Sequence, residues 1–113
     1  TLCNFNDYCT IDTISKNTAA IIMEPVQTEA GIILCDIDWL VAIRNKCNET
    51  GTILIFDEIQ LGFGRTGKLF AFENFDVIPD ILCIAKAMGS GMPIGAFISS
   101  GEYMDLLTHI LNS

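Results

Sequence analysis

Predominantly apolar residues occur along the chain in four short runs, which polar or glycine-rich stretches separate. The runs cover residues 19–23, 52–56, 81–85 and 94–99. Runs of this length, bounded by turn-forming residues, are typical of strands that are buried on both faces. They therefore predict four strands inside an α/β domain, in which helices cover a sheet.

A helix is predicted between the first two of these strands. Within residues 38–48, apolar side chains recur at helical spacing and charged side chains lie on the other side. Asp36 or Asp38 would cap its amino end, and Gly51 would end it. Because a helix of this length can return the chain across a sheet, the two strands should be parallel and joined by a right-handed crossover.

The connection between the last two predicted strands is much shorter. Only residues 86–93 separate them, which is too short for a helical crossover, so the fourth strand should run antiparallel to the third. Residues 1–17 are predicted as a loop with one short helix over residues 11–15, and another helix should begin within residues 102–109. Residues 1–113 are therefore expected to form one partial α/β domain, with a mostly parallel sheet and one antiparallel strand, incomplete at both ends.

Charge and cysteine content exclude several functions. The formal net charge is -8, from 14 acidic and 6 basic residues, which would repel nucleic acid and anionic lipid. No apolar run approaches the roughly 18 residues that a membrane span needs. The five cysteines form no C-x-x-C pair and His109 is the only histidine, so no zinc site is expected. Scattered cysteines in odd number suit reduced thiols, which predicts a cytoplasmic protein.

Charged residues follow two of the predicted strands. Asp57 and Glu58 come after residues 52–56, and Lys86 comes after residues 81–85. Ligands of open parallel sheets bind outside the carboxyl ends of the strands. A lysine there can become nucleophilic and form a Schiff base when desolvation lowers its pKa. A solvated strand end explains the same charges, and structural ion pairs also form at such positions.

Two other interpretations concern neighbouring residues. Residues 62–68 (GFGRTGK) match most of the phosphate-loop pattern G-x-x-x-x-G-K, which makes a nucleotide-binding module using Asp57 and Lys68 the alternative function. That match fails at Leu69, where a Ser or Thr hydroxyl should hold magnesium. Glu24 and Glu29 flank a predicted turn. They could form a general acid and base pair, or they could be two solvated carboxylates.

Five segments, taken in order, resemble the class-III aminotransferases, the group that contains ornithine, acetylornithine and 4-aminobutyrate aminotransferases. They are residues 24–31 (EPVQTEAG), 54–60 (LIFDEIQ), 62–68 (GFGRTGK), 79–82 (PDIL) and 85–96 (AKAMGSGMPIGA). The resemblance runs from about residue 19 to residue 109. It implies an internal piece of the large, cofactor-binding domain of a fold-type-I aminotransferase that uses pyridoxal 5'-phosphate.

The resemblance also implies residue roles. Lys86 would form a Schiff base with the cofactor and later move a proton between substrate and cofactor. Asp57 would pair with the pyridine nitrogen and keep it protonated, so that the ring can act as an electron sink. Gln60 would hydrogen-bond the 3-hydroxyl of the cofactor, and Val26 or Ile59 would touch the ring.

Substrate recognition is implied less completely. Glu29 matches the family's glutamate that pairs with an active-site arginine and gates between amino donor and oxo acid. The implied reaction moves an amino group from ornithine, acetylornithine or a similar ω-amino donor to 2-oxoglutarate, in a homodimer. Thr28, Leu61 and Ser90 depart from the family pattern, which bears on substrate preference. Because the family's phosphate-binding turn and carboxylate-binding arginine lie outside residues 1–113, the isolated chain is expected to be inactive.

Overall fold

The computed structural model describes residues 1–111, and side chains as far as residue 106. The helices are α1 (Cys9–Thr13), α2 (Ile37–Thr50) and α3 (Gly101–Leu111), with two short 3₁₀ helices, η1 (Ala71–Asn74) and η2 (Lys86–Gly89). The strands are β1 (Ala20–Met23), β2 (Val26–Gln27), β3 (Ile33–Leu34), β4 (Ile53–Asp57), β5 (Ile81–Ile84) and β6 (Ala96–Ser99). No helix among the described residues is long and apolar enough to cross a membrane.

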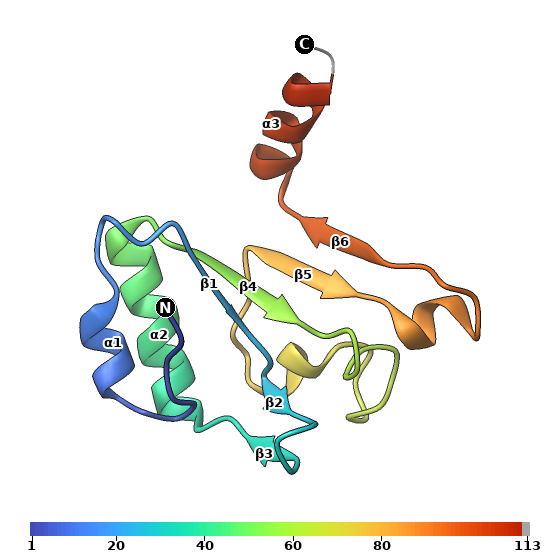
Figure 1. Ribbon diagram of the computed structural model, residues 1–113, viewed down its shortest axis with the longest axis horizontal. Helices are drawn as coiled ribbons and strands as arrows, with labels where there is room; N and C mark the ends of the chain where they lie inside the picture. Colours follow the sequence, from blue (N-terminus) through green and yellow to red (C-terminus); the bar gives the residue numbers. More distant parts are fainter. Residues whose placement is uncertain (112–113) are drawn as a thin grey trace.

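Four strands form one mixed sheet in the order β1-β4-β5-β6. Strand β4 lies parallel to both β1 and β5, whereas β6 runs antiparallel to β5. Figure 1 shows the carboxyl ends of β1, β4 and β5 on the same side of the molecule, with β6 pointing the other way. The predicted mixed sheet is therefore confirmed.

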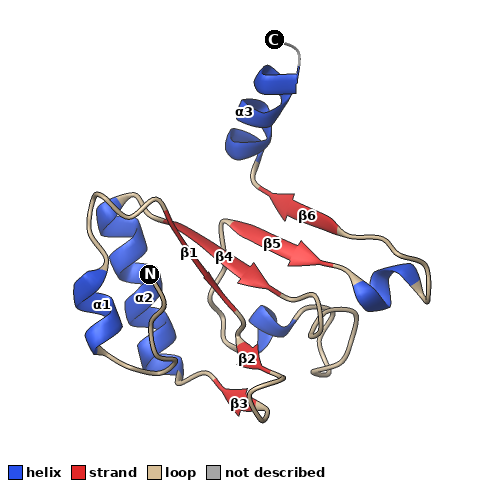
Figure 2. Ribbon diagram, viewed as in Figure 1, coloured by secondary structure: helices blue, strands red, loops and turns tan. Residues whose placement is uncertain are grey.

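Helix α2 forms as its sequence pattern predicts. Of the two candidate caps, Asp36 is the one used, because its Oδ1 accepts the N–H of Trp39 at 2.9 Å. Gly51 ends the helix in the left-handed region at φ 74°, a conformation that glycine adopts without strain. The apolar side of α2 packs into the core with Leu54 and Phe56 of β4, and α1 lies beside α2 (Figure 2).

The two faces of the sheet are covered unequally. Alternate side chains of the central strands face the helices and are buried; they are Leu54, Phe56, Leu82 and Ile84. Those between them, such as Ile55, are half-buried, and Ile22 of the edge strand β1 is 69% exposed. The prediction of strands buried on both faces is therefore wrong for the described residues, because α2 and the amino-terminal segment pack on one face.

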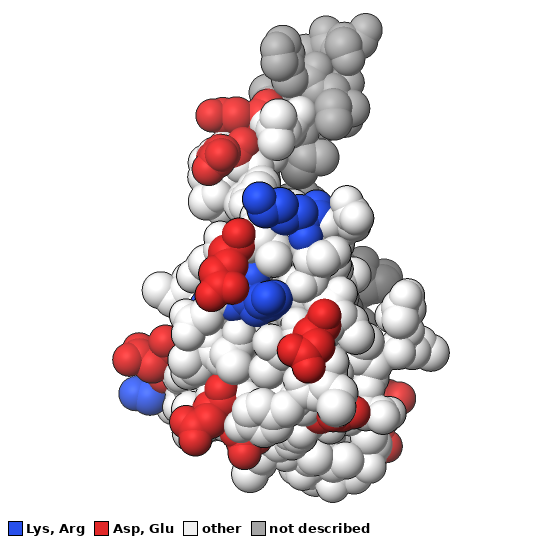
Figure 3. Space-filling view, turned by 90° about the vertical axis from the view of Figure 1, so that its left-hand side faces the viewer, with Lys and Arg blue, Asp and Glu red and all other residues white. Residues whose placement is uncertain are grey.

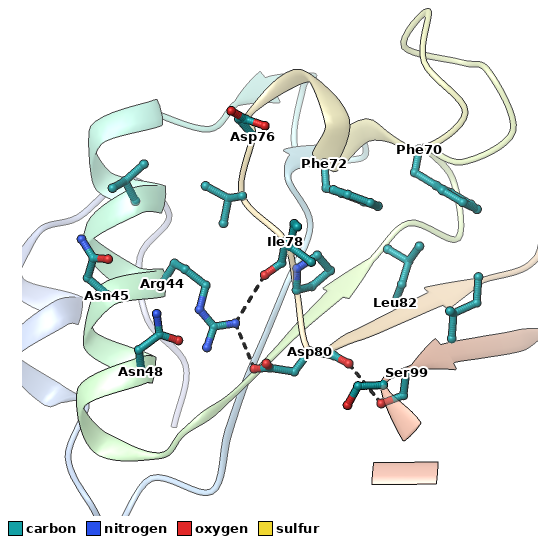
Figure 4. Close-up of a pocket in the computed structure, with 15 residues that line it drawn as sticks. Arg44, Asn45, Asn48, Phe70, Phe72, Asp76, Ile78, Asp80, Leu82 and Ser99 are labelled. Atoms are coloured by element: carbon teal, nitrogen blue, oxygen red, sulfur yellow. Dashed lines mark hydrogen bonds and ion pairs between the residues drawn. The ribbon is translucent and has the colours of Figure 1, made fainter. Parts of the chain in front are cut away.

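Asp80 joins α2 to three strands at the amino end of β5. Its Oδ2 accepts the N–H of Leu54 at 2.7 Å and Nη1 of Arg44 at 2.9 Å, and its main-chain carbonyl accepts the hydroxyl of Ser99 at 3.1 Å. Figure 4 shows the contacts of Asp80 with Arg44 and Ser99. These residues line an open hollow of about 840 Å³ between α2, η1 and β6. No residue predicted to bind the cofactor lines this hollow.

Short elements differ most from the prediction. The first helix is Cys9–Thr13, two residues earlier than expected. Strands β2 and β3 form a small antiparallel pair that was not predicted. The helix at the carboxyl end, by contrast, covers the predicted residues.

Acidic side chains dominate the surface charge. Figure 3 shows the face that carries α1 and α2, where acidic side chains are spread widely and lie beside the few basic ones. This distribution agrees with the net charge of -8.

Candidate active site

Asp57 closes strand β4 at the edge of the sheet where parallel strands present their carboxyl ends. Its side chain is half-buried, and Oδ1 accepts the N–H of Ile59 at 3.0 Å. Among the described residues Oδ2 accepts no hydrogen bond. Across the sheet, Asp57 is paired with Cys83 of β5. The carboxylate is therefore oriented by its own turn and keeps one oxygen free for a ligand.

Lys86 lies three residues beyond Cys83, at the same edge of the sheet, and begins η2. Its side chain is exposed and forms no ion pair with any described residue. Its backbone is left-handed, at φ 44°, which costs a residue other than glycine about 1–3 kcal/mol. Backbone strain of this kind is commonest at functional sites, where surrounding structure enforces it.

The segment after Lys86 folds as a short 3₁₀ turn. The 3₁₀ helix η2 ends at Ser90, which is left-handed at φ 48°. Gly89 packs against Ile94 so closely that a Cβ there would lie 2.5 Å from Ile94 Cγ2. The glycine is thus required by close packing, and the turn holds Lys86 in place.

Gln60 and Glu29 come together from different turns. Gln60 Nε2 donates a hydrogen bond to Glu29 Oε1 at 2.9 Å. Glu24, in contrast, accepts the N–H and the hydroxyl of Thr28 through Oε2, at 3.2 and 3.1 Å. Glu24 therefore shapes the turn that carries Glu29, and among the described residues the two carboxylates bind different partners.

The two apolar candidates differ in what they offer a ligand. Val26 is 6% exposed and packs with Leu61 and Ala71 in a small cluster. Ile59 follows the strand end and is half-buried. Ile59 thus presents more surface to a ring than Val26 does.

Glu58 is a site residue whose role sequence reasoning missed. It is 1% exposed, and its two carboxylate oxygens accept the N–H groups of Ala71 at 2.6 Å and Phe72 at 2.8 Å. Burial raises the pKa of Glu58, and the two N–H donors partly oppose that rise. Strand alternation was the available signal: if Asp57 faces the ligand edge, its neighbour faces the core and needs polar partners.

The phosphate-loop alternative lacks its structural context. Residues 62–68 follow a turn, and the four-residue 3₁₀ helix η1 comes after them, where a phosphate loop needs a strand before it and an α-helix after it. The loop is closed by main-chain bonds from Phe63 and Gly64 to the carbonyl of Leu69. Lys68 is exposed. This geometry does not support nucleotide binding.

Comparison with known proteins settles the family. Residues 3–110 match the family described as aminotransferase class-III. The chain belongs to the class-III aminotransferases. This family consists of enzymes, and the mixed α/β sheet is the fold of its fold-type-I members.

Individual relatives of this class-III chain are similar over most of its length. The acetylornithine aminotransferase of Methanocaldococcus jannaschii is 49% identical over 106 residues, which are 93% of the chain and 27% of that relative. The [LysW]-aminoadipate semialdehyde/glutamate semialdehyde transaminase of Sulfolobus acidocaldarius is 48% identical over 90 residues, or 80% of the chain and 23% of that relative. The chain thus spans about a quarter of the length of these curated relatives.

A solved structure agrees with the fold. The N-acetylornithine aminotransferase from Stenotrophomonas maltophilia K279a superposes with a TM-score of 0.85 at 38% identity, covering 91% of this chain and 29% of that one.

Class-III aminotransferases use pyridoxal 5'-phosphate, and the described edge of the sheet fits the ring end of this cofactor. Lys86 has an exposed primary amine that would suit the aldehyde, and Asp57 has a free carboxylate oxygen that would suit the ring nitrogen. Gln60 supplies an amide that can meet the ring hydroxyl. Phosphate groups are usually held by helix amino ends and main-chain amides.

Proposed function

We propose that this chain is the cofactor-lysine segment of a longer class-III aminotransferase, within its large domain. The enzyme moves an amino group from acetylornithine, ornithine or a similar ω-amino donor to 2-oxoglutarate, with pyridoxal 5'-phosphate held by Lys86. The observation that carries the proposal is that two neighbouring parallel strands end at the same edge of the sheet with complementary groups. One is the free carboxylate oxygen of Asp57, and the other is the exposed amine of Lys86, which forms no ion pair with any described residue.

Lys86 has two tasks in this proposal. Its primary amine would hold the cofactor through the aldehyde group. With substrate bound, the free amine of Lys86 would act as the general base that moves a proton between the substrate carbon bearing the nitrogen and the cofactor. When bound, the cofactor supplies the electron sink for the negative charge left on that carbon.

Asp57 keeps the ring nitrogen protonated. Its Oδ1 is occupied by the N–H of Ile59, which fixes the rotation of the carboxylate and leaves Oδ2 as the acceptor for the ring N–H. An ionised carboxylate beside a cationic nitrogen favours the charged form of both groups.

Gln60 and Glu29 form the substrate side of the proposed site. The Gln60 amide has two N–H donors, one of which Glu29 accepts, so its other groups can meet the ring hydroxyl. Glu29 is exposed and can exchange this contact for a cationic partner. Replacing Glu29 by Gln should then change the ratio of the rates with amino donor and with oxo acid, and an unchanged ratio would remove the gating role.

The preferred donor is acetylornithine, because curated relatives with that activity are about half identical to the chain. The test is formation of glutamate from 2-oxoglutarate by the longer enzyme, supplied with pyridoxal 5'-phosphate and acetylornithine or ornithine in turn. Faster turnover of acetylornithine is expected. Absence of amino transfer from every ω-amino donor, in an enzyme with bound cofactor, would contradict the proposal.

Assembly and location complete the proposal. The longer enzyme is a cytoplasmic homodimer, as the family resemblance and the free cysteines suggest. The isolated chain is inactive, because the phosphate and substrate carboxylate are bound by residues outside it. Sedimentation of the longer enzyme tests whether it is a dimer. An assay of amino transfer by the isolated chain, with cofactor added, tests whether that chain is inactive.

A further inference from the structure

Glu58 is an unusual residue in this fold because it is a carboxylate buried in the core, directly beside the proposed site. Its side chain is 1% exposed, whereas fully buried glutamates are rare unless they are paired. A buried charge costs several kcal/mol in desolvation. The hydrogen bonds of Glu58 should therefore show which part of the structure depends on a carboxylate at this position.

The contacts of Glu58 meet at the turn that follows β4. Its N–H donates to the carbonyl of Cys83 at 2.9 Å, and its carbonyl accepts the N–H groups of Leu61 and Gly62 at 3.2 and 2.9 Å. The main chain of Glu58 thus connects β4 to β5 and folds the turn over residues 58–62. That turn carries Gln60, and its first N–H after Glu58 is the one that Asp57 accepts.

The side chain of Glu58 holds this turn from the opposite face. Asp57 and Glu58 are adjacent in an extended segment, so their side chains point to opposite faces of the sheet. Both oxygens of Glu58 are occupied by main-chain N–H groups of residues 71 and 72, at the start of η1. Glu58 therefore clamps the turn to the core while Asp57 projects from it.

We propose that Glu58 is a positioning residue, which fixes the turn that presents Asp57 and Gln60 to pyridoxal 5'-phosphate and thereby sets cofactor affinity and the protonation of the ring. This rests on the proposed function. A packing role alone would be served by an apolar side chain, but that would leave the buried N–H of Ala71 and the partly buried N–H of Phe72 without acceptors.

The test compares Glu58→Gln with Asp80→Asn in the longer enzyme. Both changes replace a carboxylate by an amide of the same size. Glu58 accepts two main-chain N–H groups beside the proposed site, whereas Asp80 accepts one, at the amino end of β5. At a temperature below both unfolding transitions, Glu58→Gln should raise the cofactor dissociation constant about tenfold or more, as expected for an unsatisfied buried donor at the turn. It should also shift the pH midpoint of the visible cofactor band. Asp80→Asn should destabilise the fold and leave both readings near those of the wild type.

Equal changes in cofactor affinity for the two variants, at equal loss of unfolding temperature, would overturn the proposal. A Glu58→Gln enzyme with the wild-type affinity and band midpoint would also overturn it. If that variant does not fold, hydrogen exchange in the wild type decides: cofactor binding should protect the amides of residues 71 and 72 as well as those of 57–60, and unprotected amides at 71 and 72 would contradict the clamp. A wild type without any cofactor band at Lys86 would instead refute the proposed function.

Discussion

The two ends of the central strands use carboxylates in different ways. At the amino end of β5, Asp80 accepts a main-chain N–H from Leu54 and the guanidinium of Arg44 through one oxygen. At the carboxyl end of β4, Asp57 accepts one N–H through Oδ1 and keeps Oδ2 free. The backbone next to β5 also differs, because Lys86, two residues after the strand, is left-handed at φ 44°, whereas residues 77–80 before the strand have no positive φ. Carboxylate contacts at the amino ends of the central strands therefore join elements of the fold. At the carboxyl ends, polar groups remain free for a ligand.

The largest expected effect comes from replacing Lys86 by glycine. Loss of the amine should lower activity by about 1,000-fold or more, because both cofactor attachment and proton transfer depend on it. Glycine adopts left-handed φ freely, so the same change should also stabilise the fold by about 1 kcal/mol. Activity assays and urea unfolding measure the two effects. Ser90→Gly is the matched control, with φ 48° in the wild type, and should gain similar stability while keeping activity. An active Lys86→Gly enzyme would contradict the role of Lys86 as the cofactor lysine.

Asp57→Asn should have the next largest effect. Asparagine can still accept the N–H of Ile59, but it lacks the charge that keeps the ring nitrogen protonated. Turnover should fall about 100-fold, in the range for loss of one electrostatic contact to the reacting charge, while the cofactor remains attached to Lys86. Asp76→Asn changes an exposed carboxylate and should leave turnover unchanged. Equal turnover in the two variants would show that Asp57 is not the partner of the ring.

Arg44→Met should affect the amino end alone. The ion pair with Asp80 is partly exposed, so its loss should lower the free energy of unfolding by about 1 kcal/mol or less. Cofactor affinity should not change. Lys46→Met removes an exposed contact with Glu49 at 3.9 Å and should cost still less. A larger loss of cofactor affinity than of stability in Arg44→Met would mean that the two ends are coupled.

The smallest expected effect is a pH dependence of stability at Glu58. Burial raises its pKa above the ordinary value of 4.5, so the folded state binds the proton more tightly than the unfolded state. The contribution of Glu58 is therefore fully present below pH 4.5 and is lost as pH rises through the raised pKa. The unfolding midpoint of the wild type minus that of Glu58→Gln, measured at a series of pH values, gives the contribution of Glu58 to stability. A difference that increases with pH would have the wrong sign.

Features of this fold were predictable where a single segment of the sequence carries the signal. The apolar runs locate β4 and β5 to within one residue, and the short connection before β6 predicts its antiparallel direction. The cap at Asp36 and the stop at Gly51 follow from residue type. Asp57 and Lys86 are predicted as site residues because charges that end apolar strands lie at the ligand edge of a parallel sheet.

Other features depend on partners that are distant in the sequence. Strands β2 and β3 are two residues each, too short for any periodicity, and the turn between them is shaped by Glu24 and Thr28. The N–H groups that Glu58 binds lie 13 and 14 residues further along the chain. An apolar run also does not reveal which face of its strand is covered, which is why the exposure of Ile22 was not foreseen.

The most direct test of the central claim is to locate the cofactor on the protein. The longer enzyme is loaded with pyridoxal 5'-phosphate, reduced with borohydride, digested and examined by mass spectrometry. The account predicts one phosphopyridoxyl group, on Lys86. A group on Lys68, or a cofactor-loaded enzyme with none on Lys86, would contradict it.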